Sequence, residues 1–228
     1  MRAAYLFLAA LSIPTAAIAQ AEDCPAPPEG GDDISVYVEM PAYSVSHALS
    51  ASQLTDRFGG RSMEEDMRVE GFADVGQAQA EWEYKSFAWG WQDDPQGVGC
   101  LAMKIGVTFW YDPPIVLYVA SDYPQGVACY GAVLAHEQQH YEVTKELAET
   151  FGRRLKRALE NDPKIAKTWN PVRYYSTGER ENELRLSLER ATRVINGFAR
   201  RLNDDMTDAN ERLDSPSSYR KVYAECIE

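Results

Sequence analysis

The chain has 228 residues, and its 35 aspartates and glutamates outnumber its 23 lysines and arginines, which gives a formal net charge of −12. A surface of this sign repels phosphate backbones and anionic lipid headgroups, so nucleic acid is excluded as an expected partner. The length is sufficient for one substantial hydrophobic core, and we expect a single domain over residues 20–228.

The first twenty residues, "MRAAYLFLAALSIPTAAIAQ", have the pattern of a secretory signal peptide. Arg2 precedes an apolar stretch that ends in the small-x-small sequence Ala17-Ile18-Ala19, which signal peptidase accepts. The apolar stretch is shorter than the roughly 20 residues that a bilayer span needs. We therefore expect a signal peptide over residues 1–19, a periplasmic or secreted protein, and no stable membrane insertion after cleavage.

The chain contains four cysteines: Cys24, Cys100, Cys129 and Cys226. An even number of cysteines in an exported chain indicates disulfide bonds, because the compartment is oxidising. Three pairings are possible, and we expect Cys100 to pair with Cys129 and Cys24 to pair with Cys226. None of the cysteines has the Cys-x-x-Cys spacing of a structural zinc site.

The first half of the chain predicts strands. Alternating apolar residues from Ile34 to Met40 indicate one strand, and a short helix is expected between Ser50 or Ser52 and Gly59. The segments "AEWEYKSFAWGW", "CLAMKIGVTFWY" and "IVLYVA" are rich in aromatic and β-branched residues. They predict three antiparallel strands, of which the last two form a hairpin. Within the middle one, "MKIGVTFWY" is a candidate edge for pairing with an extended peptide.

The second half predicts two long helices. Apolar residues recur at every third or fourth position from Ala132 to Glu160 and again from Glu179 to Ala209. Strands followed by helices are typical of an α+β fold. We therefore expect an antiparallel sheet in the N-terminal half and two long packed helices in the C-terminal half.

The segment "LAHEQQHYEV", residues 134–143, holds two histidines that are four residues apart. On a helix, His136 and His140 lie one above the other on the same face, where both can bind one ion. Glu137 directly follows the first of them, which completes the HExxH motif of zinc metalloproteases on a zincin-like helix. Zinc would lower the pKa of a bound water toward about 7. Glu137 is then the general base, and it passes the proton to the leaving amine.

A catalytic zinc ion normally has three protein ligands, and the sequence offers two candidates for the third. Antiparallel packing of the two long helices brings residues 198–205 to the level of His140, and Asp205 faces inward there. Asp214 follows the second helix and could fold back toward the first. Tyr141, Tyr219 and Tyr223 are candidate donors to a developing oxyanion.

The order of these features resembles the bacterial "domain of unknown function 922" family, whose members are regarded as secreted zinc-dependent proteases. The resemblance runs through "YSVSHALSASQLTDRFGG", "EWEYKSF", "GCLAMKIGVTF" and "VLAHEQQHYEV". It implies zinc binding and proteolysis, with the family's HExxH on His136, Glu137 and His140 and its mid-domain cysteine at Cys100. The chain departs from the family pattern at Tyr219, which stands where the family has a histidine.

The leading prediction is therefore an exported zinc-dependent peptidase that acts on peptide or protein substrates. One alternative is a non-catalytic periplasmic binding or scaffold protein with a vestigial metal site. Another is a metal-dependent amidase that cleaves cell-wall peptides, since the same chemistry serves both reactions.

Overall fold

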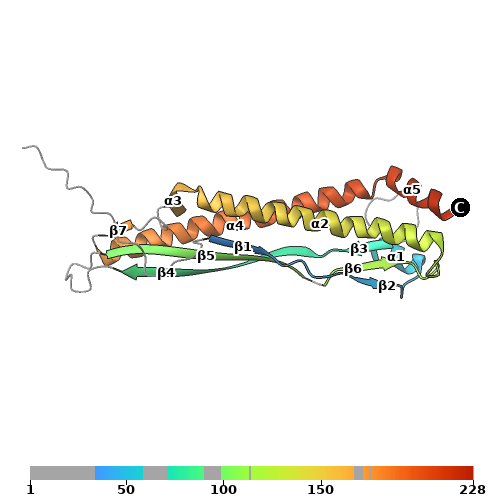
Figure 1. Ribbon diagram of the computed structural model, residues 1–228, viewed down its shortest axis with the longest axis horizontal. Helices are drawn as coiled ribbons and strands as arrows, with labels where there is room; N and C mark the ends of the chain where they lie inside the picture. Colours follow the sequence, from blue (N-terminus) through green and yellow to red (C-terminus); the bar gives the residue numbers. More distant parts are fainter. Residues whose placement is uncertain are drawn as a thin grey trace, which may run out of the picture.

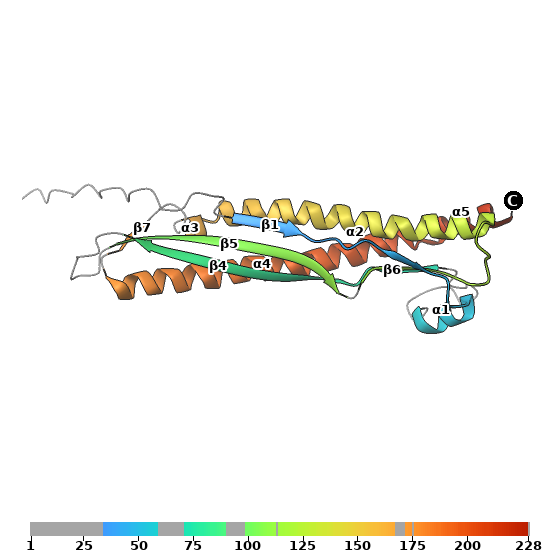
Figure 2. The same cartoon turned by 60° about the horizontal axis from the view of Figure 1, so that its bottom comes forward.

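The computed structural model describes residues 34–58, 71–89, 99–112, 114–166, 172–174 and 176–227. The predicted signal peptide and Cys24 lie outside these residues. The molecule is elongated: two long helices run side by side along its longest axis, and the strands extend along the same direction (Figures 1 and 2). The predicted α+β fold is confirmed, with strands in the first half and two long packed helices in the second.

The larger sheet has the order β1-β5-β4, formed by β1 (Ile34–Val38), β5 (Gly99–Asp112) and β4 (Gln77–Trp89), and β7 (Val172–Tyr174) pairs with the start of β5. The β4 and β5 strands are antiparallel, but β1 joins β5 in parallel, so the sheet is mixed and not purely antiparallel as predicted. Because β5 is paired with β4 on one side and with β1 and β7 on the other, the prediction of a free edge at 103–111 is wrong.

A smaller sheet has the order β2-β6-β3, formed by β2 (Ser44–Ser46), β6 (Val116–Val119) and β3 (Gly71–Asp74). The β6 strand pairs with β2 in parallel and with β3 in antiparallel fashion. The predicted hairpin between residues 100–111 and 115–120 is therefore wrong. Two-residue hairpins favour residues with positive φ, such as Asn-Gly, which the Pro113-Pro114 sequence cannot supply.

The short helix α1 (Ala51–Phe58) matches its prediction. Ser50 caps it, because the backbone N–H of Gln53 donates to Ser50 Oγ over 3.3 Å and the backbone N–H of Ser50 donates to Gln53 Oε1 over 2.8 Å. This reciprocal pair satisfies two backbone donors at the start of the helix.

The two long helices are α2 (Ala128–Glu160) and α4 (Thr177–Leu213), and the short helix α3 (Pro163–Ala166) follows α2. The main core lies between these helices and the larger sheet, where β5 contributes Ile105, Val107 and Phe109. Gly152 allows α2 to approach β1 closely, because a Cβ at this position would lie 2.9 Å from Val38 Cγ2. The second half of α2 is thereby packed against the larger sheet.

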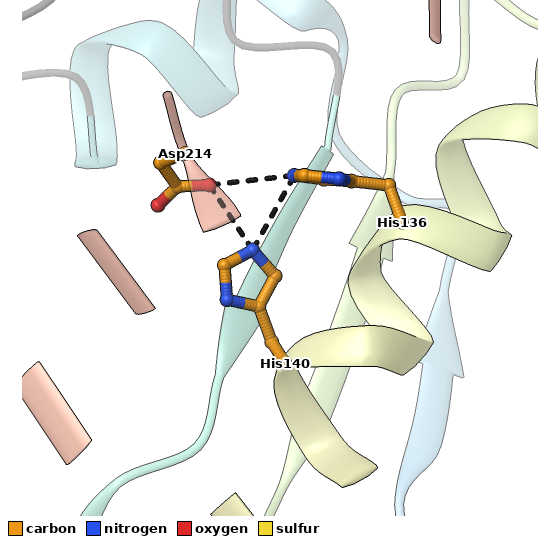
Figure 3. A group of neighbouring side chains, drawn as sticks. All are labelled: His136, His140 and Asp214. Atoms are coloured by element: carbon orange, nitrogen blue, oxygen red, sulfur yellow. Dashed lines mark hydrogen bonds and ion pairs between the residues drawn. The ribbon is translucent and has the colours of Figure 1, made fainter. Parts of the chain in front are cut away.

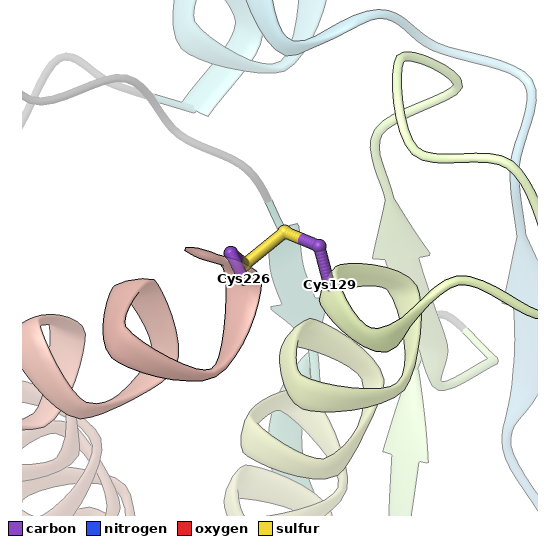
Figure 4. Close-up of a disulfide and its surroundings, with 2 residues drawn as sticks. All are labelled: Cys129 and Cys226. Atoms are coloured by element: carbon purple, nitrogen blue, oxygen red, sulfur yellow. A yellow bond between two sulfur atoms is a disulfide. The ribbon is translucent and has the colours of Figure 1, made fainter. Parts of the chain in front are cut away.

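A further helix, α5 (Pro216–Ile227), follows α4 and was not predicted. It lies at the end of the molecule where α2 begins (Figure 1). A disulfide joins Cys129 in the first turn of α2 to Cys226 in the last turn of α5 (Figure 4). Cys100 is also disulfide-bonded. Both predicted pairings are therefore wrong, because α5 brings Cys226 back to the start of α2. No helix among the described residues is both long and apolar enough to cross a bilayer.

Candidate metal centre

The α2 helix places His136 and His140 on one buried face. Both residues are only 4% exposed, and their Nε2 atoms lie 3.4 Å apart with the two rings nearly perpendicular. This is the arrangement that the spacing of four predicts, because one helical turn separates the two side chains. The two imidazoles therefore present one nitrogen each to a common point.

Asp214, the C-cap residue of α4, approaches the same point from a different helix (Figure 3). Its Oδ1 atom lies 3.4 Å from His136 Nε2 and 3.0 Å from His140 Nε2. Zinc–ligand distances of about 2.0–2.1 Å in a tetrahedral arrangement separate neighbouring donor atoms by about 3.3 Å. The three side chains therefore form a group that could hold a metal ion.

Asn210, one turn before Asp214 on α4, fixes the orientation of His140. The Asn210 side-chain amide donates to the carbonyl oxygen of Met206 over 2.9 Å, so its Oδ1 atom faces His140 Nδ1 at 2.7 Å. Because an amide oxygen only accepts hydrogen bonds, Nδ1 of His140 carries a proton. In the neutral imidazole, Nε2 is then the unprotonated nitrogen that is available to a metal ion.

Tyr219 on α5 contacts both Asp214 and His136. Its hydroxyl donates to Asp214 Oδ1 over 3.1 Å, and its ring centroid lies 5.2 Å from that of His136. Burial raises the pKa of Tyr219, and the negative charge of Asp214 raises it further, so the hydroxyl stays protonated. Of the three candidate tyrosines, Tyr219 is thus at the site, whereas Tyr141 donates to the carbonyl oxygen of Pro41 at 3.3 Å.

The negative charge of Asp214 lies beside two buried imidazoles. Burial alone would raise the pKa of Asp214, but hydrogen bonds with His136 and His140 outweigh it and hold that pKa well below its ordinary value. For His140, burial opposes protonation, yet the contacts with Asp214 and the charge of Glu137 leave its pKa above the ordinary value. Asp214 is therefore a carboxylate, as a metal ligand must be.

Glu137 lies on α2, next to His136, and is 2% exposed. Burial raises its pKa to about 8, the charge of Asp214 adds to this effect and the charge of His140 opposes it. Gly71 at the start of β3 makes room for the carboxylate, because a Cβ there would lie 2.6 Å from Glu137 Oε1 and 2.6 Å from Val133 Cγ1. The backbone of β3 is thus packed directly against the Glu137 side chain.

The structure separates the two aspartates that the sequence left as alternatives. Asp214 joins the two histidines, whereas Asp205 has an exposed side chain on α4 and lies outside the group. Asn210 and Gly71 were not predicted. The spacing of four between Asn210 and Asp214 was a usable signal, since it repeats the spacing of the two histidines and places both residues on one helix face.

No family model, curated protein or solved structure matches this chain. The resemblance to the domain of unknown function 922 family therefore stays a prediction carried by the motif residues. The structure adds that the two buried HExxH histidines and the partly exposed Asp214 form a group that could hold a metal ion.

Proposed function

We propose that this chain is an exported zinc-dependent peptidase that hydrolyses peptide bonds with a metal-activated water. The observation that carries the proposal is the convergence of His136, His140 and Asp214, with Glu137 buried on the same helix. Two imidazoles and one carboxylate are a donor set that catalytic zinc sites use, with the fourth position left for water.

A bound zinc ion would supply a water molecule whose pKa is lowered toward about 7. His136, His140 and Asp214 would hold the ion, and Asn210 would keep Nε2 of His140 directed at it. Glu137 would accept the proton of the attacking water and deliver it to the leaving amine. Burial raises the pKa of Glu137 to about 8 in the metal-free protein, and the positive charge of a bound ion would favour the ionised carboxylate that this role needs. Tyr219 stays protonated, and it would donate to the carbonyl oxygen that becomes negative by giving up its hydrogen bond to Asp214.

An oxidising compartment suits the same proposal. The Cys129–Cys226 disulfide is of the kind that persists in secreted and periplasmic proteins. A periplasmic or secreted location, with removal of residues 1–19, therefore belongs to the proposed function. Its partners would be peptides or proteins, and the acidic surface does not favour nucleic acid.

Two other functions use the same residues. A non-catalytic binding or scaffold protein is favoured by the burial of His136, Glu137 and His140, because a structural metal centre needs no access for substrate. Against it, the Asp214 side chain is 39% exposed, which leaves the group open to solvent on that side. A cell-wall peptide amidase would need only a different substrate at the same centre.

The test compares the wild type with Glu137→Gln and Asp205→Ala. Elemental analysis should find zinc in all three proteins, because neither substitution removes one of the three converging side chains. Hydrolysis of denatured protein should fall by about 10²-fold or more in Glu137→Gln and stay unchanged in Asp205→Ala. Peptidoglycan peptides, assayed in parallel, identify the amidase.

Zinc binding without hydrolysis of either substrate by the wild type would identify the binding protein. A wild type that contains no metal and takes up no zinc would overturn the proposed function.

A further inference from the structure

The α5 helix is attached to the rest of the molecule by few buried side chains. Of its side chains that the structure describes, only Tyr219 is buried. Val222 and Cys226 are partly buried against the small cluster of Val119, Cys129 and Val133. Apolar burial stabilises a helix roughly in proportion to the area removed from water, so these contacts alone hold α5 weakly.

The disulfide and the metal centre lie at matching positions along α2 and α5. Cys129 is seven residues before His136 on α2, and Cys226 is seven residues after Tyr219 on α5. Seven residues are about two helical turns, so each pair shares one face of its helix. The α5 helix is thus joined to α2 at two levels: Cys226 is bonded to Cys129, and the Tyr219 ring lies 5.2 Å from the His136 ring.

This helix also contacts the third candidate ligand. Asp214 lies in the connection between α4 and α5, two residues before α5 begins. Its Oδ1 atom accepts a hydrogen bond from Tyr219, and this same atom faces both imidazoles. A displacement of α5 would therefore remove the Tyr219 hydrogen bond and leave Asp214 held by the end of α4, where its backbone N–H donates to the carbonyl oxygen of Asn210.

We propose that the Cys129–Cys226 disulfide gates the metal centre, so that the redox state of this disulfide sets the affinity for the metal. The inference rests on the proposed metal site and adds its regulation. In the oxidised chain the covalent bond keeps α5 on α2, and α5 keeps Asp214 beside His136 and His140. In the reduced chain α5 keeps the packing of Tyr219 and of the partly buried Val222 but loses its covalent bond to α2, so Asp214 is held less firmly beside the histidines.

The switching reaction is a thiol–disulfide exchange with a dithiol reductant. Two electrons and two protons pass from the dithiol to the S–S bond, which breaks to give the thiols of Cys129 and Cys226. The dithiol becomes a disulfide in the same exchange. By linkage the effect is reciprocal: bound metal must stabilise the disulfide by the same factor by which the disulfide strengthens metal binding.

The first experiment compares zinc affinities in the absence of thiols, by competition with a chromophoric chelator. The proteins are the wild type, Cys129→Ser/Cys226→Ser and the control Cys24→Ser/Cys100→Ser, which removes the other two cysteines. The gated site predicts that zinc binding weakens about 10-fold or more in Cys129→Ser/Cys226→Ser, a loss typical of disturbing the partners of metal ligands. The control should stay within about threefold of the wild type. Serine replaces cysteine so that a freed thiolate cannot bind zinc.

A second experiment uses the wild-type chain, in case the double serine variant does not fold. The dithiothreitol concentration that reduces half of the Cys129–Cys226 disulfide at equilibrium is measured by alkylation and mass spectrometry, with and without zinc. Zinc should raise this concentration in the wild type and not in His136→Ala/His140→Ala, which controls for zinc bound by the reductant.

Equal zinc affinity in the wild type and in folded Cys129→Ser/Cys226→Ser would overturn the gate, as would equal half-reduction concentrations of dithiothreitol with and without zinc in the wild type. A wild type that binds no zinc at all is a distinct result, and it would overturn the metal centre and the gate together.

Discussion

His140 directs its two ring nitrogens at the end of α4: Nδ1 lies 2.7 Å from Oδ1 of Asn210 in the last turn, and Nε2 lies 3.0 Å from Oδ1 of the C-cap residue Asp214. Asn210 and Asp214 are one helical turn apart, so a single face of α4 provides both the candidate ligand and the group that orients another ligand. The metal centre is thus built between two helix faces, with the relevant side chains spaced by four on each.

Asn210→Ala should weaken zinc binding about 10–100-fold, because the orienting partner of a metal-bound histidine typically contributes that much. Competition with a chromophoric chelator measures the change. Asn203→Ala is a matched control from the same face of α4, since Asn203 bonds the backbone N–H and C=O of Ala78 and not the site. It should cost about 1–3 kcal/mol of stability and leave zinc affinity intact. Similar zinc affinities in the two variants would contradict this role of Asn210.

Asp214→Ala should weaken zinc binding by more than the loss expected for Asn210→Ala, because it removes a ligand and not a partner of one. Asp205→Ala is the control, as Asp205 is exposed on the same helix. Isothermal titration of the metal-stripped proteins with zinc measures the zinc affinities of Asp214→Ala, Asp205→Ala and the wild type. If Asp205→Ala weakened binding and Asp214→Ala did not, the assignment of the third ligand would be reversed.

The HExxH helix could be predicted from the sequence because its geometry is local. A spacing of four fixes His136 and His140 on one face whatever α2 packs against. The position of the third ligand depends on how α4 packs along α2, which no local pattern reveals. The prediction of residues 198–205 assumed that the last residues of α2 lie beside the first residues of α4. Arg190 Nε donates to Asp162 Oδ2 over 2.7 Å, so the end of α2 meets α4 thirteen residues after α4 begins. This offset moves the level of His140 on to Asn210 and Asp214.

The sheets and α5 depended on contacts that no local pattern reveals. The alternation of apolar residues predicts β1 and β5 as strands, yet their parallel pairing links Ile34 to Ile105 across a long stretch of sequence. The α5 helix has one buried side chain, Tyr219, among those described, so its sequence lacks the apolar stripe that signals a helix. The wrong disulfide pairings follow from this missed helix, since α5 carries Cys226.

Gly71→Ala should disturb Glu137 while the zinc ligands stay in place. The added methyl group would lie 2.6 Å from Glu137 Oε1 and 2.6 Å from Val133 Cγ1, so one or both side chains must move. We expect a loss of stability of about 1–3 kcal/mol, as is typical of overpacking a core. We also expect hydrolysis to fall more than zinc affinity, measured on the same preparation.

Gly197→Ala is the control for that substitution, because a Cβ at this helical position meets nothing within 4 Å. It should stabilise the protein by about 0.5–1 kcal/mol, the usual difference between alanine and glycine inside a helix. Equal unfolding free energies for Gly71→Ala and the wild type would show that β3 does not pack on Glu137 as described.

The metal-free protein should lose stability as the pH rises from 5 to 8. Folded Glu137 keeps its proton up to a pKa of about 8, whereas in the unfolded chain it ionises near 4.5. Over this range the unfolded state binds fewer protons, so the free energy of unfolding falls as pH rises. The raised pKa of His140 acts in the same direction, since its contribution is complete below 6.5 and is lost at higher pH. The lowered pKa of Asp214 adds a constant amount above about 3.8.

Urea unfolding of metal-stripped protein at pH 5, 6, 7 and 8 measures this slope, and Glu137→Gln should make it shallower because the glutamine does not titrate. The other acidic residues titrate in both proteins, so the difference between the two profiles isolates Glu137. Added zinc should act in the opposite sense: its ligands must be deprotonated, so the stabilisation by zinc should grow from pH 5 to 8. Parallel profiles for the wild type and Glu137→Gln would contradict the assignment, because they would mean that burial does not raise the pKa of Glu137 in the metal-free protein.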